Sequence, residues 1–298
     1  MYRCAVLLAT KNGSQFIKEQ IESIIAQRNV EINLFVCDDQ SSDDTVQIIK
    51  NNFTKKYHFI ELKKTKSSAA LNFFNLIIKT NFSNFDYIAL SDQDDIWHQR
   101  KINRAIECLT KSNSDCYSSS VTAYWSDGKK KLLKKNGKLS KYNYFFESPG
   151  PGCTFVFRVD VANALKKLII ANESELYEVD FHDWFIYAWA CSQGYSWYID
   201  EQSLIYYRQH TKNVFGANVG YSQIIRRWKL LTDGWYVKQI LTISRILGLE
   251  NNDLVIKIDR LHFSDRVYLA LRAYFFRRRF RDKFMLALAF LVMKNTKQ

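Results

Sequence analysis

The chain has 298 residues, of which 47% are hydrophobic and 15% aromatic, so it is long and apolar enough to bury a large core. This composition excludes an intrinsically disordered protein, and because no apolar run approaches about 18 residues, we expect no membrane-spanning helix. A formal net charge of +13 predicts an anionic partner, which could be nucleic acid, acidic lipid or a phosphorylated small molecule.

The amino-terminal segment "MYRCAVLLATKNGS" has one arginine before a short apolar run and no cleavage pattern of a signal peptide. We therefore interpret it as a first strand and expect the chain to remain in the cytoplasm. None of the six cysteines forms a CxxC pair, which favours free, buried thiols over a zinc site or disulfides.

Strand and helix patterns alternate over the first hundred residues. Residues 3–10 form a continuous apolar run, typical of a strand that is buried on both faces, and isoleucines at helical spacing follow between residues 17 and 25. Further strands are predicted at 32–39, 58–63 and 86–91, and helices at 41–53, 69–80 and 99–111. Such alternation predicts an α/β fold, a parallel sheet with helices on both faces.

The second half of the chain is less regular. The basic segment 129–141 is predicted to be an exposed loop or hairpin, and both prolines lie in 148–157, which reads as a turn that enters another strand. A buried helix is predicted at 181–194 and a strand at 196–210. From residue 221 to residue 298 the chain is helical in character, basic and aromatic.

Polar side chains gather where three of the predicted strands end. In open parallel sheets, ligands bind outside the carboxyl ends of the strands, so these side chains are expected around one crevice. They are Thr10, Lys11 and Asn12 after the first strand, Asp38 and Asp39 after the second, and Asp92, Asp94 and Asp95 after the fourth.

The three carboxylates in "SDQDD" have two possible roles. One or two of them could simply cap a following helix. Three carboxylates within four residues, however, repel one another unless a cation lies among them, and oxygen ligands of this kind suit Mg²⁺ or Mn²⁺ bound to a substrate diphosphate. Asp38 and Asp39 could likewise cap a helix, or accept hydrogen bonds from a ligand ring or ribose.

Seven short segments carry a family resemblance. They occur in the family's order between residues 1 and 216: "VLLATKNGSQFIKEQIESIIAQ", "CDDQSSDDT", "LNFF", "LSDQDDIWHQRKI", "GPGCTFVF", "FHDWF" and "YYRQHTKNVFG". Together they resemble the family 2 glycosyltransferases, and "SDQDDIW", "HDW" and "YRQH" resemble the bacterial rhamnosyltransferase-like branch, whose members build O-antigen, capsule and other surface polysaccharides.

The resemblance implies a GT-A fold, a Rossmann-like sheet that binds a nucleotide sugar, followed by a helical extension. It divides the chain into a catalytic domain at 1–220, with a nucleotide-sugar half at 1–111 and an acceptor half at 112–220, and a carboxyl-terminal region at 221–298. One departure is Lys11, because members commonly carry a tyrosine there, and this puts the identity of the donor in doubt.

The resemblance also assigns roles to residues. Asp39 would bind the nucleotide base with Thr10 beside it, Asp92 and Asp94 match the DxD motif, and Asp183 matches the catalytic base. Asp94 and His210 would hold Mn²⁺ or Mg²⁺. The donor-binding residues that the resemblance implies are Thr10, Asn12, Asp39, Asn72, Asp92, Gln93 and Asp94.

The expected reaction is an inverting transfer of a sugar from dTDP-rhamnose or a UDP-sugar to a hydroxyl of a glycan acceptor linked to polyprenyl diphosphate. A nucleic-acid-binding protein would also explain the charge, but metal-free acids at the strand ends would repel phosphate, and the chain has no nucleic-acid motif. A nucleotidyltransferase usually opens with a glycine-rich loop, whereas "LLATKNGSQF" has one glycine. A non-catalytic nucleotide-binding protein of the same fold would not need Asp39, Asp94 and Asp183.

The last segment, 266–294, places a cluster of basic residues ahead of the apolar stretch "FMLALAFLVM". This arrangement suits an amphipathic helix on the inner face of the cell membrane, so peripheral membrane contact through the basic carboxyl terminus is expected. A helical cap with a solvated basic edge fits the pattern equally well. The clustered residues are Arg277, Arg278, Arg279, Arg281 and Lys283.

Overall fold

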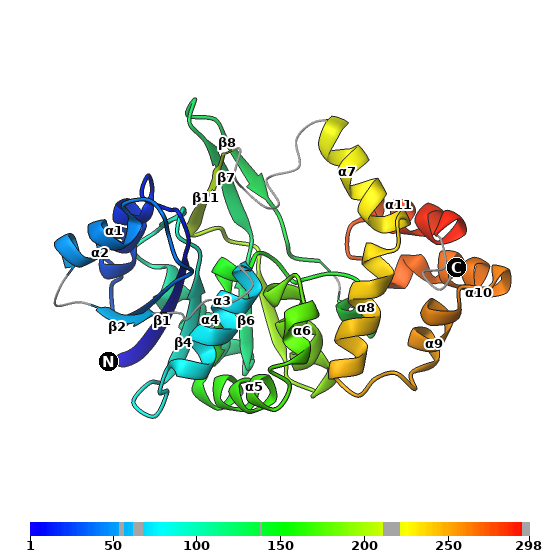
Figure 1. Ribbon diagram of the computed structural model, residues 1–298, viewed down its shortest axis with the longest axis horizontal. Coiled ribbons are helices and arrows are strands. Elements are labelled where there is room, and N and C mark those ends of the chain that lie inside the picture. Colours follow the sequence, from blue (N-terminus) through cyan, green and yellow to red (C-terminus); the bar gives the residue numbers. More distant parts are fainter. Residues whose placement is uncertain (54–56, 62–67, 138, 211–220, 294–298) are drawn as a thin grey trace.

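The computed structural model describes residues 1–53, 57–61, 68–137, 139–210 and 221–293. Its centre is a seven-stranded sheet in the order β10-β6-β9-β4-β1-β2-β3 (Figure 1). The strands are β1 (Tyr2–Thr10), β2 (Val30–Asp38), β3 (Tyr57–Glu61), β4 (Tyr87–Ser91), β6 (Cys116–Ser119), β9 (Val156–Arg158) and β10 (Trp197–Asp200).

The predicted parallel arrangement is confirmed for the amino-terminal half of this sheet, where β1 pairs in parallel with β2 and β4, and β2 with β3. It does not extend to β9, which runs antiparallel to both β4 and β6. The sheet is therefore mixed, and β9 lies between β4 and β6.

Helices cover both faces of the sheet, as the unbroken apolar sequence of β1 requires. Cys4, Val6 and Leu8 belong to the core on one face, whereas Ala5, Leu7 and Ala9 belong to the core on the other. The first core includes α1 (Ile17–Ile25), α2 (Thr45–Phe53) and α4 (Lys101–Ser112); the second includes α3 (Ala69–Lys79), α5 (Val159–Ala171) and α6 (His182–Ser192). Short 3-10 helices lie at Asn143–Phe145, Gly152–Thr154 and Glu175–Glu178.

A second sheet has four strands in the order β5-β11-β7-β8. They are β5 (Ile96–Trp97), β7 (Val121–Trp125), β8 (Lys130–Leu133) and β11 (Ile205–Gln209). Of the exposed loop or hairpin expected in 129–141, β8 forms one strand of a hairpin whose other strand, β7, precedes the segment, and residues 134–137 form neither helix nor strand. The single strand predicted at 196–210 is wrong: β10 and β11 belong to different sheets, because the polar residues 201–203 interrupt the apolar pattern.

The carboxyl-terminal region is helical, as predicted, and lies on the side of the molecule opposite α1 and α2 (Figure 1). It comprises α7 (Tyr221–Thr232), α8 (Trp235–Ile246), α9 (Asp253–Arg260), α10 (Phe263–Arg272), the 3-10 helix η4 (Ala273–Phe275) and α11 (Phe280–Val292). These helices share one hydrophobic core with α3, α5 and α6. Within the described ranges, every helix is too short or too polar to cross a bilayer.

Some predicted features lie outside the described residues. They are the end of the strand expected at 58–63, the boundary at residue 220, the last part of "YYRQHTKNVFG" and the end of the chain after Met293. The prediction of free thiols is confirmed: all six cysteines are unpaired, and five of them are buried.

The ring of Phe276 stacks on that of Phe146, with centroids 4.3 Å apart, and joins the carboxyl-terminal helices to the rest of the core. We expect Phe276→Ala to lower the free energy of unfolding by about 3–5 kcal/mol, because it opens a cavity in a shared core. Urea denaturation should still show a single transition. The neighbouring Phe275 is 55% exposed, so Phe275→Ala should change stability by only about 0.5 kcal/mol or less. Two separate transitions would contradict a shared core.

Candidate active site

A cleft of about 1730 Å³ opens where β1, β2 and β4 end. All the site residues predicted from the sequence line this cleft. They are Thr10, Asn12, Asp39, Asn72, Asp92, Gln93, Asp94, Asp183 and His210. The topology brings them together because the carboxyl ends of parallel strands meet at one edge of the sheet.

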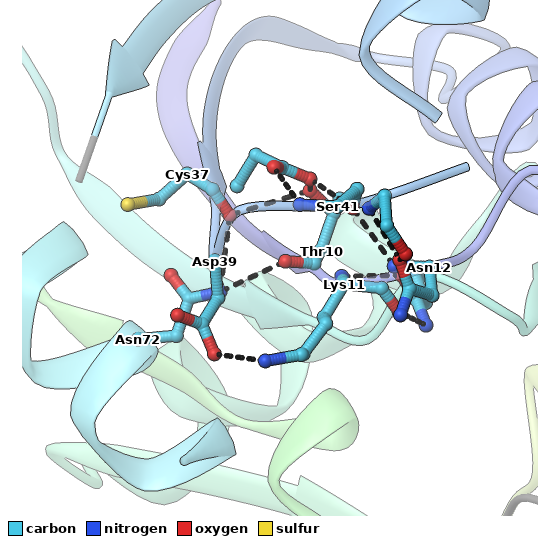
Figure 2. A network of polar contacts seen from close by, with 10 residues as sticks. Thr10, Lys11, Asn12, Cys37, Asp39, Ser41 and Asn72 are labelled. Atoms are coloured by element: carbon cyan, nitrogen blue, oxygen red, sulfur yellow. Dashed lines mark hydrogen bonds and ion pairs between the residues drawn. The ribbon is translucent and has the colours of Figure 1, made fainter. Parts of the chain in front are cut away.

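Asp38, which ends β2, and Asp39, which follows it, make different contacts, and Figure 2 shows the pairing of Asp39 with Lys11. Asp38 organises the loop: its carboxylate accepts hydrogen bonds from Thr10 Oγ1 at 2.9 Å and from the Ser41 backbone N–H at 2.8 Å. Asp39 instead lines the cleft, where Lys11 Nζ lies 3.2 Å from its carboxylate. Asp38 therefore holds the loop ahead of α2 (Thr45–Phe53) and does not cap that helix, whereas Asp39 lines the cleft where a ligand would bind.

Asn12 fixes the loop that follows β1. Its φ of +48° lies in the left-handed region, which asparagine tolerates better than most residues. Its N–H donates to Ser41 Oγ, and its Oδ1 accepts from the Ser42 N–H, both at 2.8 Å. The next turn is held by Asp43, which accepts from the Ser14 and Thr45 N–H groups; these hydrogen bonds outweigh partial burial and lower the pKa of Asp43 to about 2.

Two amide side chains tie the strand ends together. Asn72 Nδ2 donates to the carbonyl oxygens of Thr10 at 3.2 Å and Cys37 at 3.1 Å, so it bridges β1 and β2. Its Oδ1 is buried without a hydrogen-bond partner. Gln93 clamps Lys11, accepting from its N–H at 2.8 Å and donating to its carbonyl at 2.9 Å. This clamp fixes the end of β4 against the end of β1.

The three acids after β4 are held in different surroundings. Asp94 Oδ2 lies 2.8 Å from His210 Nε2, and the His210 ring stacks on Phe16 with centroids 5.0 Å apart. Asp95 is 1% exposed and accepts from the Arg208 N–H at 3.3 Å, but its Oδ2 is buried with no hydrogen-bond partner. Ligand atoms of Asp92, Asp95 and Cys153 lie within 4.8 Å of one another.

This crowding opposes ionisation. Burial, together with the charges of Asp94 and Asp183, raises the pKa of Asp92 to about 7. Burial, with Asp94 and Asp92 nearby, also raises the pKa of Asp95 well above its usual range. A divalent cation would relieve this repulsion, and the oxygens of Asp92 and Asp94 with the imidazole of His210 are ligands that Mn²⁺ accepts. The chemistry of these side chains therefore suits Mn²⁺ or Mg²⁺, whereas the group of three whose ligand atoms converge within 4.8 Å among the described residues is Asp92, Asp95 and Cys153.

Asp183 begins α6 on the other side of the cleft. Its Oδ1 accepts from the Trp184 N–H at 2.7 Å, and burial raises its pKa to about 6. The preceding His182 stacks on Phe73 with centroids 4.0 Å apart, and burial lowers the pKa of this histidine to about 3. His182 is therefore a neutral packing residue that fixes the start of α6, and Asp183 has the raised pKa expected of a general base.

Two groups of site residues were missed or misplaced by the sequence. Arg208 donates a hydrogen bond from Nε to the Asp94 carbonyl at 2.9 Å and so fixes the loop that carries the acids after β4. The sequence motif "YYRQH", which contains Arg208, could have indicated this role. The arginines expected either on a membrane-facing helix or on the solvated edge of a helical cap instead line this cleft. These are Arg277, Arg278, Arg279 and Arg281.

Comparison with known proteins agrees with this geometry. A model of the family described as "Glycosyl transferase family 2" matches residues 5–170, more than half of the chain. The chain belongs to glycosyl transferase family 2.

A relative supports this family membership, and solved structures share the fold. The chain is 39% identical over 244 residues to the dTDP-rhamnosyl transferase RfbG of Shigella flexneri, which covers 81% of this chain and 84% of that protein. It is 32% identical over 105 residues to the Escherichia coli glucosyltransferase WfaP, named as acting on α-D-GlcNAc-diphosphoundecaprenol, covering 35% of this chain and 40% of WfaP.

The fold is similar to that of TarS 1-349 from S. aureus, solved with UDP-GlcNAc, with a TM-score of 0.57 and 14% identity over 96% of this chain and 79% of that one. It is also similar to the mannosyltransferase PcManGT of Pyrobaculum calidifontis, solved with GDP-Man and Mn²⁺, with a TM-score of 0.53 and 14% identity over 98% of this chain and 85% of that one.

The position of His182 in this family 2 member depends on the absence of a side chain at Gly152, because a Cβ at Gly152 would collide with His182 Nε2. We expect Gly152→Ala to lower the free energy of unfolding by about 1–3 kcal/mol, since the buried ring has to move. Adding His182→Ala removes the collision, so the effects of the two substitutions should be non-additive by about 0.5–3 kcal/mol in urea denaturation. Additive effects would show that the two residues do not press on each other.

Proposed function

We propose that this family 2 enzyme is a metal-dependent, inverting glycosyltransferase that moves a sugar from a nucleoside diphosphate to a hydroxyl of a lipid-linked or growing surface polysaccharide. The observation that carries the proposal is the two-sided cleft: Asp39, Asp92 and Asp94 lie at the strand ends, and Asp183, with its pKa raised to about 6, lines the same cleft from α6. One side is suited to a metal–diphosphate donor, and the other to a hydroxyl acceptor.

The roles of the donor-side residues follow from their contacts. Asp39 accepts hydrogen bonds from the nucleotide base. When the base binds, this contact partly replaces the ion pair between Asp39 and Lys11. Asn72 Oδ1, which is buried without a partner, is available to a ligand hydroxyl or N–H. Asp92, Asp94 and His210 would hold Mn²⁺ or Mg²⁺, which when bound supplies positive charge opposite the departing diphosphate.

Asp183 removes the proton from the acceptor hydroxyl as that oxygen attacks the anomeric carbon. The attack comes from the side opposite the leaving diphosphate, so the configuration at that carbon inverts in one displacement. The Trp184 N–H, 2.7 Å from Asp183 Oδ1, holds the carboxylate in place while its other oxygen serves as the base. His182 stays neutral and contributes by packing.

The relatives suggest the substrate classes. The match to a dTDP-rhamnosyl transferase covers most of both chains, which supports rhamnose carried by dTDP as the donor. A UDP-sugar is the second candidate, supported by relatives named for UDP-glucose. The same two names support an acceptor attached to a polyprenyl diphosphate.

The metal role is tested by Asp94→Asn in a thermal-shift screen of dTDP- and UDP-sugars. At about 100 times its dissociation constant, the correct donor with Mn²⁺ should stabilise the wild-type chain by about 2.7 kcal/mol. Asp94→Asn should abolish the Mn²⁺-dependent part of this stabilisation. Asp44→Asn, which removes an exposed acid before α2, should leave it intact. Equal Mn²⁺-dependent stabilisation of the Asp94 variant would refute the metal role.

The base is tested by Asp183→Asn with the donor that this screen identifies. We expect unchanged donor affinity and a loss of about 10²- to 10⁴-fold in kcat. Because Asp183 acts in its deprotonated form and has a pKa of about 6, kcat/KM of the wild type should fall as the pH drops below about 6 and level off above it. The variant should lose this dependence. Near-normal turnover of Asp183→Asn would exclude it as the base.

We also propose that the enzyme docks on an anionic bilayer through apolar side chains of α10, η4 and α11. On α11, Phe280, Phe284, Leu288 and Leu291 form an exposed stripe at helical spacing. Leu271, Tyr274 and Phe275 add to it from the neighbouring α10 and η4, which pack against α11. Lys283, whose Nζ lies 3.7 Å from the centroid of the Tyr274 ring, places a positive charge beside these aromatic groups.

Membrane docking is tested by sedimentation with vesicles of 30% phosphatidylglycerol, a composition chosen as roughly that of an anionic leaflet. The double variant Phe280→Ser, Phe284→Ser should bind about tenfold more weakly or worse, because it removes two large apolar groups from the contact. Ile170→Ser on α5, which removes an exposed apolar group far from α11 in the chain, should have no effect. Wild-type protein that stays in the supernatant would contradict the docking surface.

A further inference from the structure

Five basic side chains line one part of the cleft, on the side of the carboxyl-terminal helices. We call them the basic wall: Lys135, Arg227, Arg277, Arg278 and Arg279. They come from the segment after β8, from α7 and from the turn between η4 and α11. Asp183 lines the same cleft, so the wall and the catalytic base face one space.

Part of the wall is built into the fold. Glu147 lies 3.2 Å from Arg278 Nε and 3.9 Å from Arg277 Nη1, so one carboxylate serves two guanidinium groups. Arg277 Nη2 also donates to Tyr236 OH at 2.9 Å, and Arg278 Nη2 donates to the Ser148 carbonyl. The Arg278 side chain is only 6% exposed. These contacts fix both guanidinium groups without using all of their N–H donors.

The wall also carries unused hydrogen-bond donors. Arg278 Nη1 and Arg277 Nε are buried and have no hydrogen-bond partner. Arg227 makes no hydrogen bond or ion pair with any residue that the structure describes. The two buried nitrogens are closed off from the cleft, so an anion there would contact the other N–H groups of these arginines and the guanidinium of Arg227, where it would also balance the buried positive charge.

The positive charges in the wall repel one another. Burial, followed by the charges of Arg279, Arg278 and Arg227, lowers the pKa of Lys135 to about 8. Burial likewise lowers the pKa of the Arg227 guanidinium, against the attraction of Asp282 and with the help of neighbouring arginines. A bound polyanion would relieve this repulsion, as a divalent cation would on the opposite, acidic side of the cleft.

We propose that the basic wall binds the diphosphate group of the acceptor, a glycosyl diphosphate attached to a lipid. The inference rests on the proposed function and adds to it the site at which the acceptor is held. Arginine forks match phosphoryl oxygens in geometry as well as in charge. The position in the chain also fits, because Arg279 immediately precedes α11, whose exposed apolar stripe begins at Phe280. A lipid diphosphate held at the wall could leave its chain along that stripe.

The proposal is tested by calorimetric titration of the full chain with inorganic pyrophosphate in EDTA. Without a divalent ion, the acidic donor side has no means of holding pyrophosphate, so binding reports the wall. We expect Arg227→Gln and Lys135→Gln each to weaken binding about tenfold or more, because each removes a charge-assisted contact. Lys229→Gln, which makes the same change on α7 outside the cleft, should leave the affinity unchanged. Arg227→Gln and Lys135→Gln should leave the Mn²⁺-dependent affinity for dTDP or UDP unchanged, because the wall lies apart from the acids on the donor side.

Several results would overturn the proposal. No metal-free binding, or an equal loss with Lys229→Gln, would remove the wall as an anion site. A comparable loss of Mn²⁺-dependent dTDP or UDP affinity in Arg227→Gln and Lys135→Gln would assign the wall to the donor. Arg227-dependent binding to phosphatidylglycerol vesicles without pyrophosphate binding would make the wall a membrane contact. Because the titration contains no sugar donor, a failure of the nucleotide-sugar screen would refute the proposed function separately.

Discussion

Negative charge crowded at the carboxyl end of β4 is the constraint on which the rest of the site depends. Asp92, Asp94 and Asp95 follow a fully buried strand in a chain of net charge +13. Burial, together with the charges of neighbouring acids, raises the pKa of Asp92 to about 7 and the pKa of Asp95 well above its usual range. Arg208 and His210 reach these acids from β11 and the residue after it, but they do not supply a divalent charge. This surplus of negative charge is the feature that supports the proposed binding of a cation together with the substrate diphosphate.

The cleft places opposite charges on its two sides. Strand ends supply carboxylates on the donor side, and the carboxyl-terminal helices supply arginines beyond Asp183. A transfer between two diphosphate-bearing molecules has to hold both without letting their charges repel each other. Metal-mediated binding on one side and direct arginine binding on the other would separate the two diphosphates, with the catalytic carboxylate facing the space between them.

Much of this site follows from the sequence alone because strand periodicity is a local property. The apolar runs locate β1, β2 and β4, and the residues after each run must lie at one edge of a parallel sheet, which is why Thr10, Asp39 and Asp94 line one cleft. The different tasks of Asp38 and Asp39 could not be predicted in the same way. They are set by which carboxylate the loop at Ser41 and the hydroxyl of Thr10 reach.

Long-range partners account for the other differences. The polar residues 201–203 separate β10 from β11, and the two strands belong to different sheets. The direction of β9 is set by its pairing with β4 and β6, which lie far from it in the sequence, so local periodicity could not predict that β9 is antiparallel. The sequence places Arg277 and Arg278 in a basic cluster typical of a protein surface. In the structure Glu147, about 130 residues earlier, contacts both residues and fixes them at the cleft. The apolar residues that follow them, Phe280 and Phe284, remain exposed on the surface.

The most direct measurement of the central claim is anomalous diffraction at the manganese edge from a crystal grown with Mn²⁺ and dTDP or UDP. The account predicts one manganese peak bounded by Asp92 and Asp94 and in contact with the nucleotide diphosphate. A bound nucleotide with no manganese at those carboxylates would contradict it.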